Sequence, residues 1–236
     1  MKAYVVIFPG SNCDRDVIHS LSTRLKTNVS ALWYEKHKLP QDTDLVVLPG
    51  GFSYGDYLRC GAMAATAPIL NAIKGYAESG GLVLGICNGF QILTEARLLP
   101  GALLANKNLK FICRQCTVRA ERTDTPFTSN LQTGQVLKMP IAHHEGLYFL
   151  PPNDLKQILA NKQVVFRYCN NDGTIDDKSN PNGSVDNIAG VINKGGNVLG
   201  LMPHPERASE KILGSEDGGL IWDSIASWLK KGGAVK

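Results

Sequence analysis

The chain has 236 residues, of which 43% are hydrophobic and 19% charged, with a net charge of +4. This length and composition suit one globular domain, residues 1–236, and the interleaved acidic and basic residues offer no run that favours a nucleic-acid partner. No apolar stretch approaches the roughly 20 residues that span a bilayer, and the six cysteines show no disulfide spacing, so we expect a cytoplasmic protein without a membrane segment.

The first part of the chain alternates apolar strands with helices. The expected strands are residues 3–8, 28–34, 45–48 and 82–86, and the expected helices are 14–25, 62–76 and 90–96. Continuous apolar strands separated by helices predict a parallel sheet that is covered on both faces. The fold class is therefore α/β, with an open, mostly parallel sheet flanked by helices.

The pattern changes after residue 110 to strand-like alternation. Further strands are expected at 110–118, 135–142, 163–169, 188–193 and 198–202, and a closing helix at 218–230. These strands follow one another without helices, which predicts a mixed or antiparallel extension of the sheet. The polar stretch 170–187 carries two turn signals and forms either a long hairpin or an excursion over the active-site face.

Cys87 lies where an apolar strand turns into a helix. It is flanked by Gly85 and Gly89, a pattern typical of a nucleophile elbow, where the glycines tolerate a tight turn and the central side chain projects above the sheet. A helix N-terminus and a nearby imidazolium both raise the thiolate fraction of a cysteine. Cys87 is therefore the candidate nucleophile; the alternative is a buried core cysteine.

His204 is the candidate base for this thiol. It lies in the run Pro203-His204-Pro205-Glu206, and each proline favours an extended conformation in the residue before it. In an extended chain, residues two apart point to the same side, so Glu206 can reach the His204 ring and orient it. The sequence predicts a triad of Cys87, His204 and Glu206; the alternative is a proline-rich turn with a solvated histidine.

Backbone amides near Cys87 are candidates for stabilising an oxyanion. Asn88 follows the nucleophile, and Gly50, Gly51 and Phe52 end the strand expected at 45–48. Amides at tight glycine turns can point at a developing negative charge, although a flexible turn explains the glycines equally well.

The chain lacks the usual signals for metals and nucleotides. Cys113 and Cys116 form a C-x-x-C without a second pair, and their spacing on an alternating strand directs them to opposite faces, so we expect no metal site. Neither a GxxxxGK[ST] phosphate loop nor a GxGxxG fingerprint occurs, so any ATP-dependent step belongs to another polypeptide.

The motifs GICNGFQ (85–91) and HPE (204–206) resemble those of the class I, or triad, glutamine amidotransferases, whose fold is flavodoxin-like. Four further motifs resemble the glutaminase subunits of phosphoribosylformylglycinamidine synthase: FPGSNCD (8–14), GGFSYGD (50–56), IAHHEG (141–146) and NPNGS (180–184). This resemblance extends from about Lys2 to the C-terminal helix.

The resemblance implies that Cys87 attacks the side-chain amide of glutamine, His204 relays the proton to the departing ammonia, and water hydrolyses the glutamyl thioester. It also implies that Gly51 and Asn88 supply oxyanion donors and that Gln91 helps to hold glutamine. The ammonia would pass to a large ATP-dependent synthetase subunit, assisted by a small bridging subunit, which converts formylglycinamide ribonucleotide to its amidine. ATP and magnesium are expected on that partner, and no cofactor on this chain.

Three other functions remain open at this stage. The triad also fits a glutaminase that serves a different synthetase, and the elbow alone fits a stand-alone cysteine hydrolase. A domain that only binds a partner would not need Cys87, His204 and Glu206. One residue departs from the family pattern, because His144 stands where a small residue is usual. His143 and Glu145 beside it either face the synthetase or form a structural hairpin.

Overall fold

Nine strands form one continuous sheet through the molecule. The computed structural model describes residues 1–232, so the last four residues of the expected 1–236 domain lie outside the described chain. The strand order is β2-β1-β3-β4-β11-β10-β9-β6-β7. The parallel half comprises β1 (Ala3–Ile7), β2 (Val29–Trp33), β3 (Leu45–Leu48), β4 (Leu82–Ile86) and β11 (Val198–Leu201). This order is the flavodoxin-like one, with β11 as the fifth strand.

The antiparallel half extends the sheet from β11. Its strands are β10 (Ile188–Ile192), β9 (Val164–Cys169), β6 (Ile112–Ala120) and β7 (Val136–His143). The polar stretch 170–187 connects β9 to its antiparallel neighbour β10, so it is a long hairpin connection. The predicted α/β fold with a mixed extension is confirmed.

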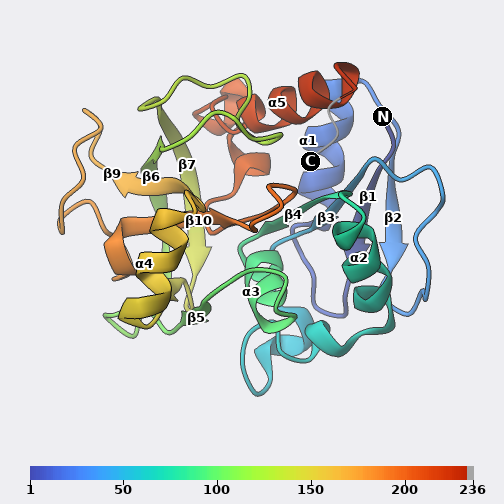
Figure 1. Cartoon of the computed structure of the whole chain (residues 1–236), viewed down its shortest axis with the longest axis horizontal. Coiled ribbons are helices and arrows are strands. Elements are labelled where there is room, and N and C mark those ends of the chain that lie inside the picture. The colour runs from blue at the N-terminus through green and yellow to red at the C-terminus, as the bar shows by residue number, and fades with distance from the viewer. Residues whose placement is uncertain (233–236) are drawn as a thin grey trace.

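Helices cover both faces of the parallel half (Figure 1). The helices α1 (Asp14–Leu25) and α5 (Gly219–Lys230) pack together on one face, where Trp222 Nε1 donates to Ser20 Oγ at 2.7 Å. The helices α2 (Pro68–Glu78) and α3 (Asn88–Glu95) cover the opposite face. None of the described helices is long and apolar enough to cross a membrane.

The helix expected at 62–76 is wrong at its start. The structure has a short 3₁₀ turn at Ala64–Thr66, and the α-helix begins only at Pro68. Ala67 is extended, with φ −63° and ψ 145°, because the proline ring that follows disfavours the helical conformation.

Three small elements were not expected from the sequence. The strands β5 (Ala102–Leu104) and β8 (Leu147–Phe149) pair in a separate two-stranded sheet, and α4 (Pro152–Ala160) follows β8. Three-residue strands are too short to show a period, and α4 buries only Ile158 completely among its residues.

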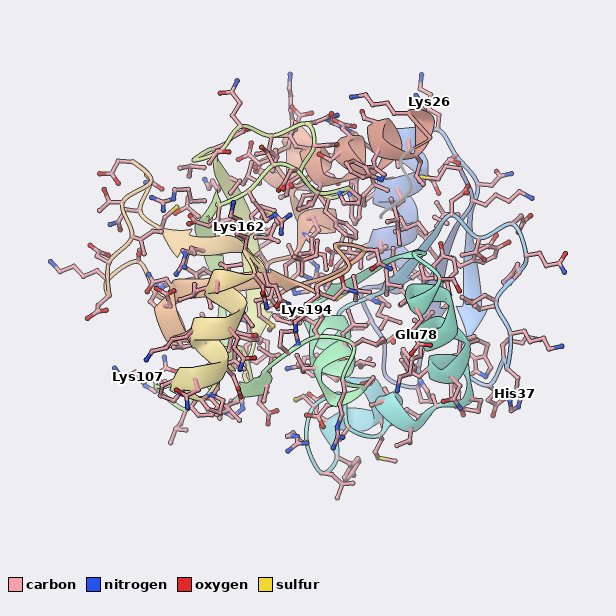
Figure 2. The ribbon with its side chains drawn as sticks, in the orientation of Figure 1. Lys26, His37, Glu78, Lys107, Lys162 and Lys194 are labelled. Carbon is pink, nitrogen blue, oxygen red and sulfur yellow. The ribbon has the colours of Figure 1, made fainter. Side chains whose placement is uncertain are left out.

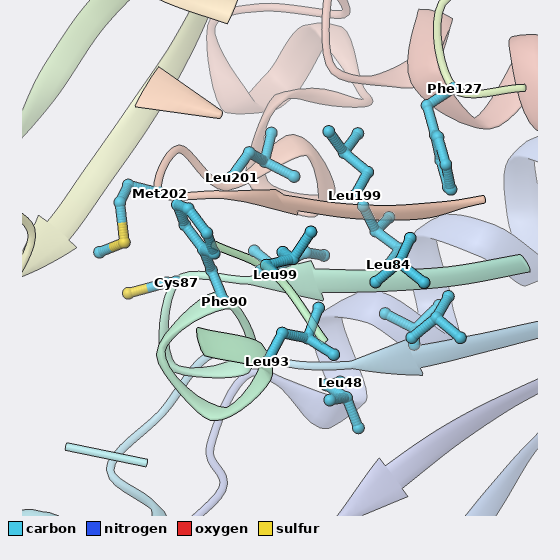
Figure 3. Packing of buried hydrophobic residues seen from close by; sticks show 14 of the residues in the cluster. Leu48, Leu84, Cys87, Phe90, Leu93, Leu99, Phe127, Leu199, Leu201 and Met202 are labelled. Atoms are coloured by element: carbon cyan, nitrogen blue, oxygen red, sulfur yellow. The ribbon is translucent and has the colours of Figure 1, made fainter. Parts of the chain in front are cut away.

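The core is centred on β4, whose five residues are all buried. Around its end, Figure 3 shows Cys87 beside Phe90, Leu93 and Met202. Burying a large apolar side chain contributes roughly 1.5–3 kcal/mol, so the packing around β4 makes a large contribution to stability. The nucleophile candidate therefore stands on a rigid platform.

Charged side chains are dispersed around the molecule. Figure 2 shows Lys26, Lys107 and Lys162 projecting from three well-separated parts of the surface. They belong to different connections between elements, and acidic residues lie between them in the sequence. These three lysines therefore do not form a track of positive charge of the kind that follows a phosphate backbone.

Candidate active site

Cys87 occupies a strained backbone position between β4 and α3. Its φ is 50° and its ψ is −104°, an unusual conformation for a residue other than glycine. The Cys87 N–H donates to Leu201 O at 2.8 Å, which anchors the turn to β11. The side chain stands at the N-terminus of α3, where the helix dipole favours negative charge.

The two glycines of the elbow permit close packing, and they do not themselves adopt positive φ. A Cβ at Gly89 would lie 1.9 Å from Leu48 O, and one at Gly85 would lie 2.6 Å from Gly89 O. The glycines therefore tolerate the tight turn by lacking a side chain, and not by adopting positive φ. The strain lies on Cys87, and the glycines let α3 approach the ends of β3 and β4.

His204 and Glu206 form a buried pair. His204 Nδ1 and Glu206 Oε1 are 2.6 Å apart, and the two residues are 1% and 2% exposed. His204 is extended, but Glu206 lies in the 3₁₀ turn Pro205–Ala208, so the predicted extended run is wrong beyond His204. The carboxylate reaches the ring because the chain turns after Pro205.

The imidazole of His204 also meets two thiols. Burial lowers its pKa, but the Glu206 carboxylate and the Cys87 and Cys13 sulfurs outweigh burial, so the His204 pKa lies well above its ordinary value. The Cys87 Sγ lies 3.7 Å from Ala142 O of β7. The ends of β4, β7 and β11 thus bring Cys87 and the His204–Glu206 pair together.

The loop after β3 supplies an amide beside the elbow. Gly51 has φ 139°, a conformation that side-chain-bearing residues rarely adopt, and within residues 1–232 its N–H makes no hydrogen bond. Phe52 N–H donates to Gly10 O at 3.0 Å, so the Phe52 amide is already engaged. Asn88 begins α3, where N–H groups lack intrahelical acceptors. Of the three residues predicted to supply oxyanion donors, Gly51 and Asn88 are therefore the two whose amides have no backbone acceptor within residues 1–232.

Gln91 lies on α3 with its side-chain amide directed toward protein groups. Its Nε2 donates to Glu145 O at 2.6 Å, and its Oε1 accepts from Asn88 Nδ2 at 2.8 Å. Each end of the amide retains one further hydrogen-bonding position. A glutamine contact would therefore add to these bonds.

Sequence reasoning did not single out Cys13 as a site residue. Cys13 precedes α1, and its Sγ accepts from Arg207 Nη2 at 3.1 Å. Burial is the main cause that raises the pKa of the Cys13 thiol, which keeps it neutral. The only available signal was the FPGSNCD motif, in which nothing marks the cysteine as a neighbour of His204.

The donor atoms of Cys13, His204 and Glu206 lie within 4.8 Å of one another, the one such cluster in residues 1–232. Their residue types suit a thiophilic divalent cation. However, His204 and Glu206 are hydrogen-bonded to each other, and Arg207 lies against the thiol. This arrangement serves the triad geometry better than a metal.

Unpaired polar atoms gather around this site. Within residues 1–232, the buried side-chain polar atoms without a hydrogen-bond partner are Ser53 Oγ, Asp56 Oδ1, His143 Nε2, His204 Nε2 and Glu206 Oε2. His143 ends β7, and the other four lie in the turns that follow β3 and β11. Buried polar groups are almost always paired in folded proteins, so these atoms are candidates for contact with a polar ligand.

Large apolar side chains are exposed in the segments 52–58 and 109–111. Leu58 is 93% exposed, Tyr57 74% and Leu109 73%, and the rings of Phe52 and Phe111 meet with centroids 6.4 Å apart. We call these five residues the apolar rim. Exposed apolar groups that gather on a surface are typical of protein–protein interfaces.

This fold, with a cysteine elbow facing a buried histidine–glutamate pair, is that of the class I glutamine amidotransferases. The family model for the CobB/CobQ-like glutamine amidotransferase domain matches residues 1–229. The chain belongs to this family and, within it, to the PurQ subunits of phosphoribosylformylglycinamidine synthase.

Curated relatives and solved structures agree with this assignment. The PurQ subunit of phosphoribosylformylglycinamidine synthase from Acaryochloris marina is 54% identical over all of both chains. The PurQ subunit from Aquifex aeolicus is 53% identical, covering 96% of this chain and 100% of the relative. The structure of PurLQS from Thermotoga maritima contains a chain 46% identical, with a TM-score of 0.84, covering 97% of this chain and 98% of that one.

Proposed function

We propose that Cys87, His204 and Glu206 are the catalytic triad with which this chain hydrolyses glutamine for phosphoribosylformylglycinamidine synthase. The observation that carries the assignment is the strained Cys87 elbow beside a fully buried His204–Glu206 pair. The activity is that of the PurQ glutaminase subunit, which supplies ammonia for purine biosynthesis.

The geometry supports a thioester mechanism. Cys87 Sγ attacks the side-chain carbonyl carbon of glutamine, and the thiol proton passes to His204. The oxyanion accepts hydrogen bonds from the amides of Gly51 and Asn88. The C–N bond then breaks, His204 returns the proton to the leaving nitrogen, and ammonia departs. Water activated by His204 attacks the thioester, which releases glutamate and restores the thiol.

Glu206 acts on His204 and not on glutamine. Its carboxylate accepts the Nδ1 proton, so Nε2 faces the reaction and the imidazolium is stabilised. These steps use only side chains and amides of this chain, which accords with a subunit that carries no cofactor.

The ammonia is used by a larger partner. The partners are the large synthetase subunit PurL and the small subunit PurS, and the product is formylglycinamidine ribonucleotide. We place ATP and magnesium on the large subunit and the complex in the cytoplasm. We also place the chain's residues in a single domain, which the continuous nine-stranded sheet supports. These relatives favour this enzyme over a different synthetase or a stand-alone hydrolase.

The test separates glutamine hydrolysis from synthesis in the reconstituted three-subunit complex. Cys87→Ala abolishes glutamine-dependent synthesis and leaves ammonia-dependent synthesis within about twofold, because the nucleophile is needed only to release ammonia. The control is Cys113→Ala, which removes an exposed thiol from β6, the strand next to the edge strand β7. Equal loss of both activities in Cys87→Ala would contradict the assignment.

Covalent labelling tests the substrate independently. A diazo-ketone analogue of glutamine is expected to modify Cys87 alone, and excess glutamine is expected to suppress the modification. Peptide mass mapping of all six cysteines identifies the adduct. Unprotected labelling spread over several cysteines, in the complex as well as in the free chain, would refute glutamine as the substrate.

A further inference from the structure

A continuous series of hydrogen bonds joins the loop after β7 to the loop after β3. Gln91 Nε2 donates to Glu145 O at 2.6 Å, and Asn88 Nδ2 donates to Gln91 Oε1 at 2.8 Å. Ser53 N–H then donates to Asn88 Oδ1 at 3.2 Å. Two side chains of α3 thus connect segments that are almost a hundred positions apart in the sequence.

The direction of this series is fixed by its ends. A backbone N–H can only donate and a backbone carbonyl can only accept, so Ser53 N–H and Glu145 O dictate the orientation of both amides. Asn88 and Gln91 are 1% and 4% exposed, so no water can replace a lost partner without disturbing the packing. Such a buried series resists local rearrangement.

Each end lies next to the chemistry. Ser53 follows Gly51 by two residues, and the Gly51 amide is one of the two proposed oxyanion donors. The other end belongs to the loop 143–146, which follows Ala142, whose carbonyl oxygen lies 3.7 Å from Cys87 Sγ. Because Asn88 and Gln91 connect the two loops, a shift of either loop changes the position of the other.

The loop 143–146 is itself held from outside. Asn182 Nδ2 donates to Gly146 O at 2.8 Å, and Gly146 N–H donates to Asn106 Oδ1 at 3.1 Å. The Glu145 side chain also accepts from Cys60 N–H at 3.4 Å. These contacts give the NPNGS motif a role, because Asn182 anchors the far end of the series.

We propose that the side chains of Asn88 and Gln91 are positioning groups that set the Gly51 amide against Cys87 according to the place of the loop 143–146. The inference rests on the proposed glutaminase function and deepens it. Neither side chain needs to touch the reacting atoms for this role. The Asn88 N–H acts separately, as a donor.

A double-mutant cycle tests the coupling in the reconstituted complex. Asn88→Ala and Gln91→Met are each expected to lower kcat for glutamine by roughly 10- to 100-fold, since a misplaced oxyanion donor weakens the transition state. The KM for glutamine is expected to change less than about threefold in Asn88→Ala, and to rise in Gln91→Met because Gln91 is also expected to hold glutamine. The double variant is expected to lose no more than the worse single variant, because both substitutions break one series.

Two controls isolate the positioning role. Thr94→Val removes another buried hydroxyl hydrogen bond from α3, the one from Thr94 Oγ1 to Gln91 O at 2.9 Å, and is expected to leave kcat within about twofold. Alkylation of Cys87 by iodoacetamide forms no oxyanion, so its rate is expected to be unchanged in the single variants. Retained ammonia-dependent synthesis shows that each variant complex is folded.

Three results would overturn the proposal. The first is a raised KM with unchanged kcat, which would indicate only a direct contact with the substrate. The second is a multiplicative loss of kcat in the double variant, and the third is an unchanged kcat in both single variants. If the Asn88→Ala complex loses ammonia-dependent synthesis, the Asn88→Asp variant is used in its place. Aspartate keeps an oxygen that accepts from Ser53 N–H but has no N–H group to donate to Gln91. A wild-type complex without glutaminase activity would instead refute the proposed function.

Discussion

Cys87 has an unfavourable backbone conformation that the surrounding structure stabilises. A residue such as Cys87 in a sparsely populated φ/ψ region costs of order 1–3 kcal/mol and persists only where the surroundings hold it. Here the bond from Cys87 N–H to Leu201 O and the close packing at Gly89 hold it. The turn places the thiol close to His204 at the edge of the apolar core.

Loss of the Glu206 charge is expected to impair catalysis far more than folding. Glu206→Gln keeps an oxygen near His204 Nδ1 but removes the charge that stabilises the imidazolium, so glutamine hydrolysis by the complex should fall roughly 10²- to 10⁴-fold. Steady-state glutaminase assays give this ratio, and ammonia-dependent synthesis is the control. A loss smaller than about threefold would exclude Glu206 from the triad.

His143 is expected to make stability depend on pH. Burial is the main cause that lowers the His143 pKa from 6.5 to about 3, so the folded chain keeps it neutral while the unfolded chain protonates it below pH 6.5. The contribution of the neutral His143 to the free energy of unfolding is fully present above pH 6.5. As pH falls from 6.5 toward 3 this contribution is lost, by up to about 1.4 kcal/mol per pH unit.

His143→Gln removes this titration. The unfolding free energy of the variant should decline less between pH 7 and pH 5 than that of the wild type, even though the variant starts from a lower value because of lost packing over Gly146. Denaturant titrations at several pH values measure the free energy of unfolding of the wild type and the variant. Because both proteins contain His204, its contribution cancels in the difference between them. Parallel curves would show that His143 does not titrate as its burial predicts.

At the scale of elements, α3 fits its place only because Gly89 lacks a side chain. Gly89→Ala puts a Cβ 1.9 Å from Leu48 O, a backbone atom that cannot move aside, so the variant should lose about 2–4 kcal/mol of stability. Gly75→Ala on the exposed side of α2 is the matched control. Its Cβ would meet nothing within 4 Å, and the substitution should stabilise the chain by roughly 0.5–1 kcal/mol.

Chemical denaturation of both variants checks this pair. If Gly89→Ala is as stable as the wild type, α3 does not pack as closely on β3 as the structure has it. Comparable changes in both variants would mean that helix propensity, and not contact, decides the outcome at these positions.

The elements and the triad were predictable to different degrees. Cys87 could be found because a strand-to-helix turn between two glycines is a local pattern, and the parallel strands could be found because buried strands are continuously apolar. The approach of Cys13 to His204 could not be predicted from the sequence, because it depends on how α1 meets the turn after β11. The engaged amide of Phe52 depends likewise on a contact with Gly10 across two loops.

At the scale of the whole molecule, the loop after β3 connects the catalytic site with the apolar rim. This loop carries Gly51 and Ser53 beside the site and the exposed Phe52, Tyr57 and Leu58 of the rim. Exposing apolar side chains to water is unfavourable, and a partner that covers them removes this unfavourable exposure. We expect the synthetase subunit to dock on the apolar rim, so that ammonia is released directly toward it.

Leu58→Asp tests this docking. The substitution places a charge in the apolar rim and should weaken association with the synthetase at least tenfold, while the isolated chain keeps its unfolding midpoint because Leu58 is 93% exposed. The control is Ile212→Asp, which alters a residue 90% exposed on a different segment and should change affinity less than about twofold. Calorimetric titration measures both, and equal effects would refute docking at the rim.

The pairing of β4 with β11 also has a consequence in time. Ile86 beside the elbow pairs with Leu201, and His204 follows shortly afterwards, so the thiol and its base come from segments far apart in the chain. During synthesis, Cys87 is therefore added long before His204. Contacts between distant segments also form late in folding. The nascent chain therefore carries the Cys87 thiol for a time without the histidine that is to act as its base.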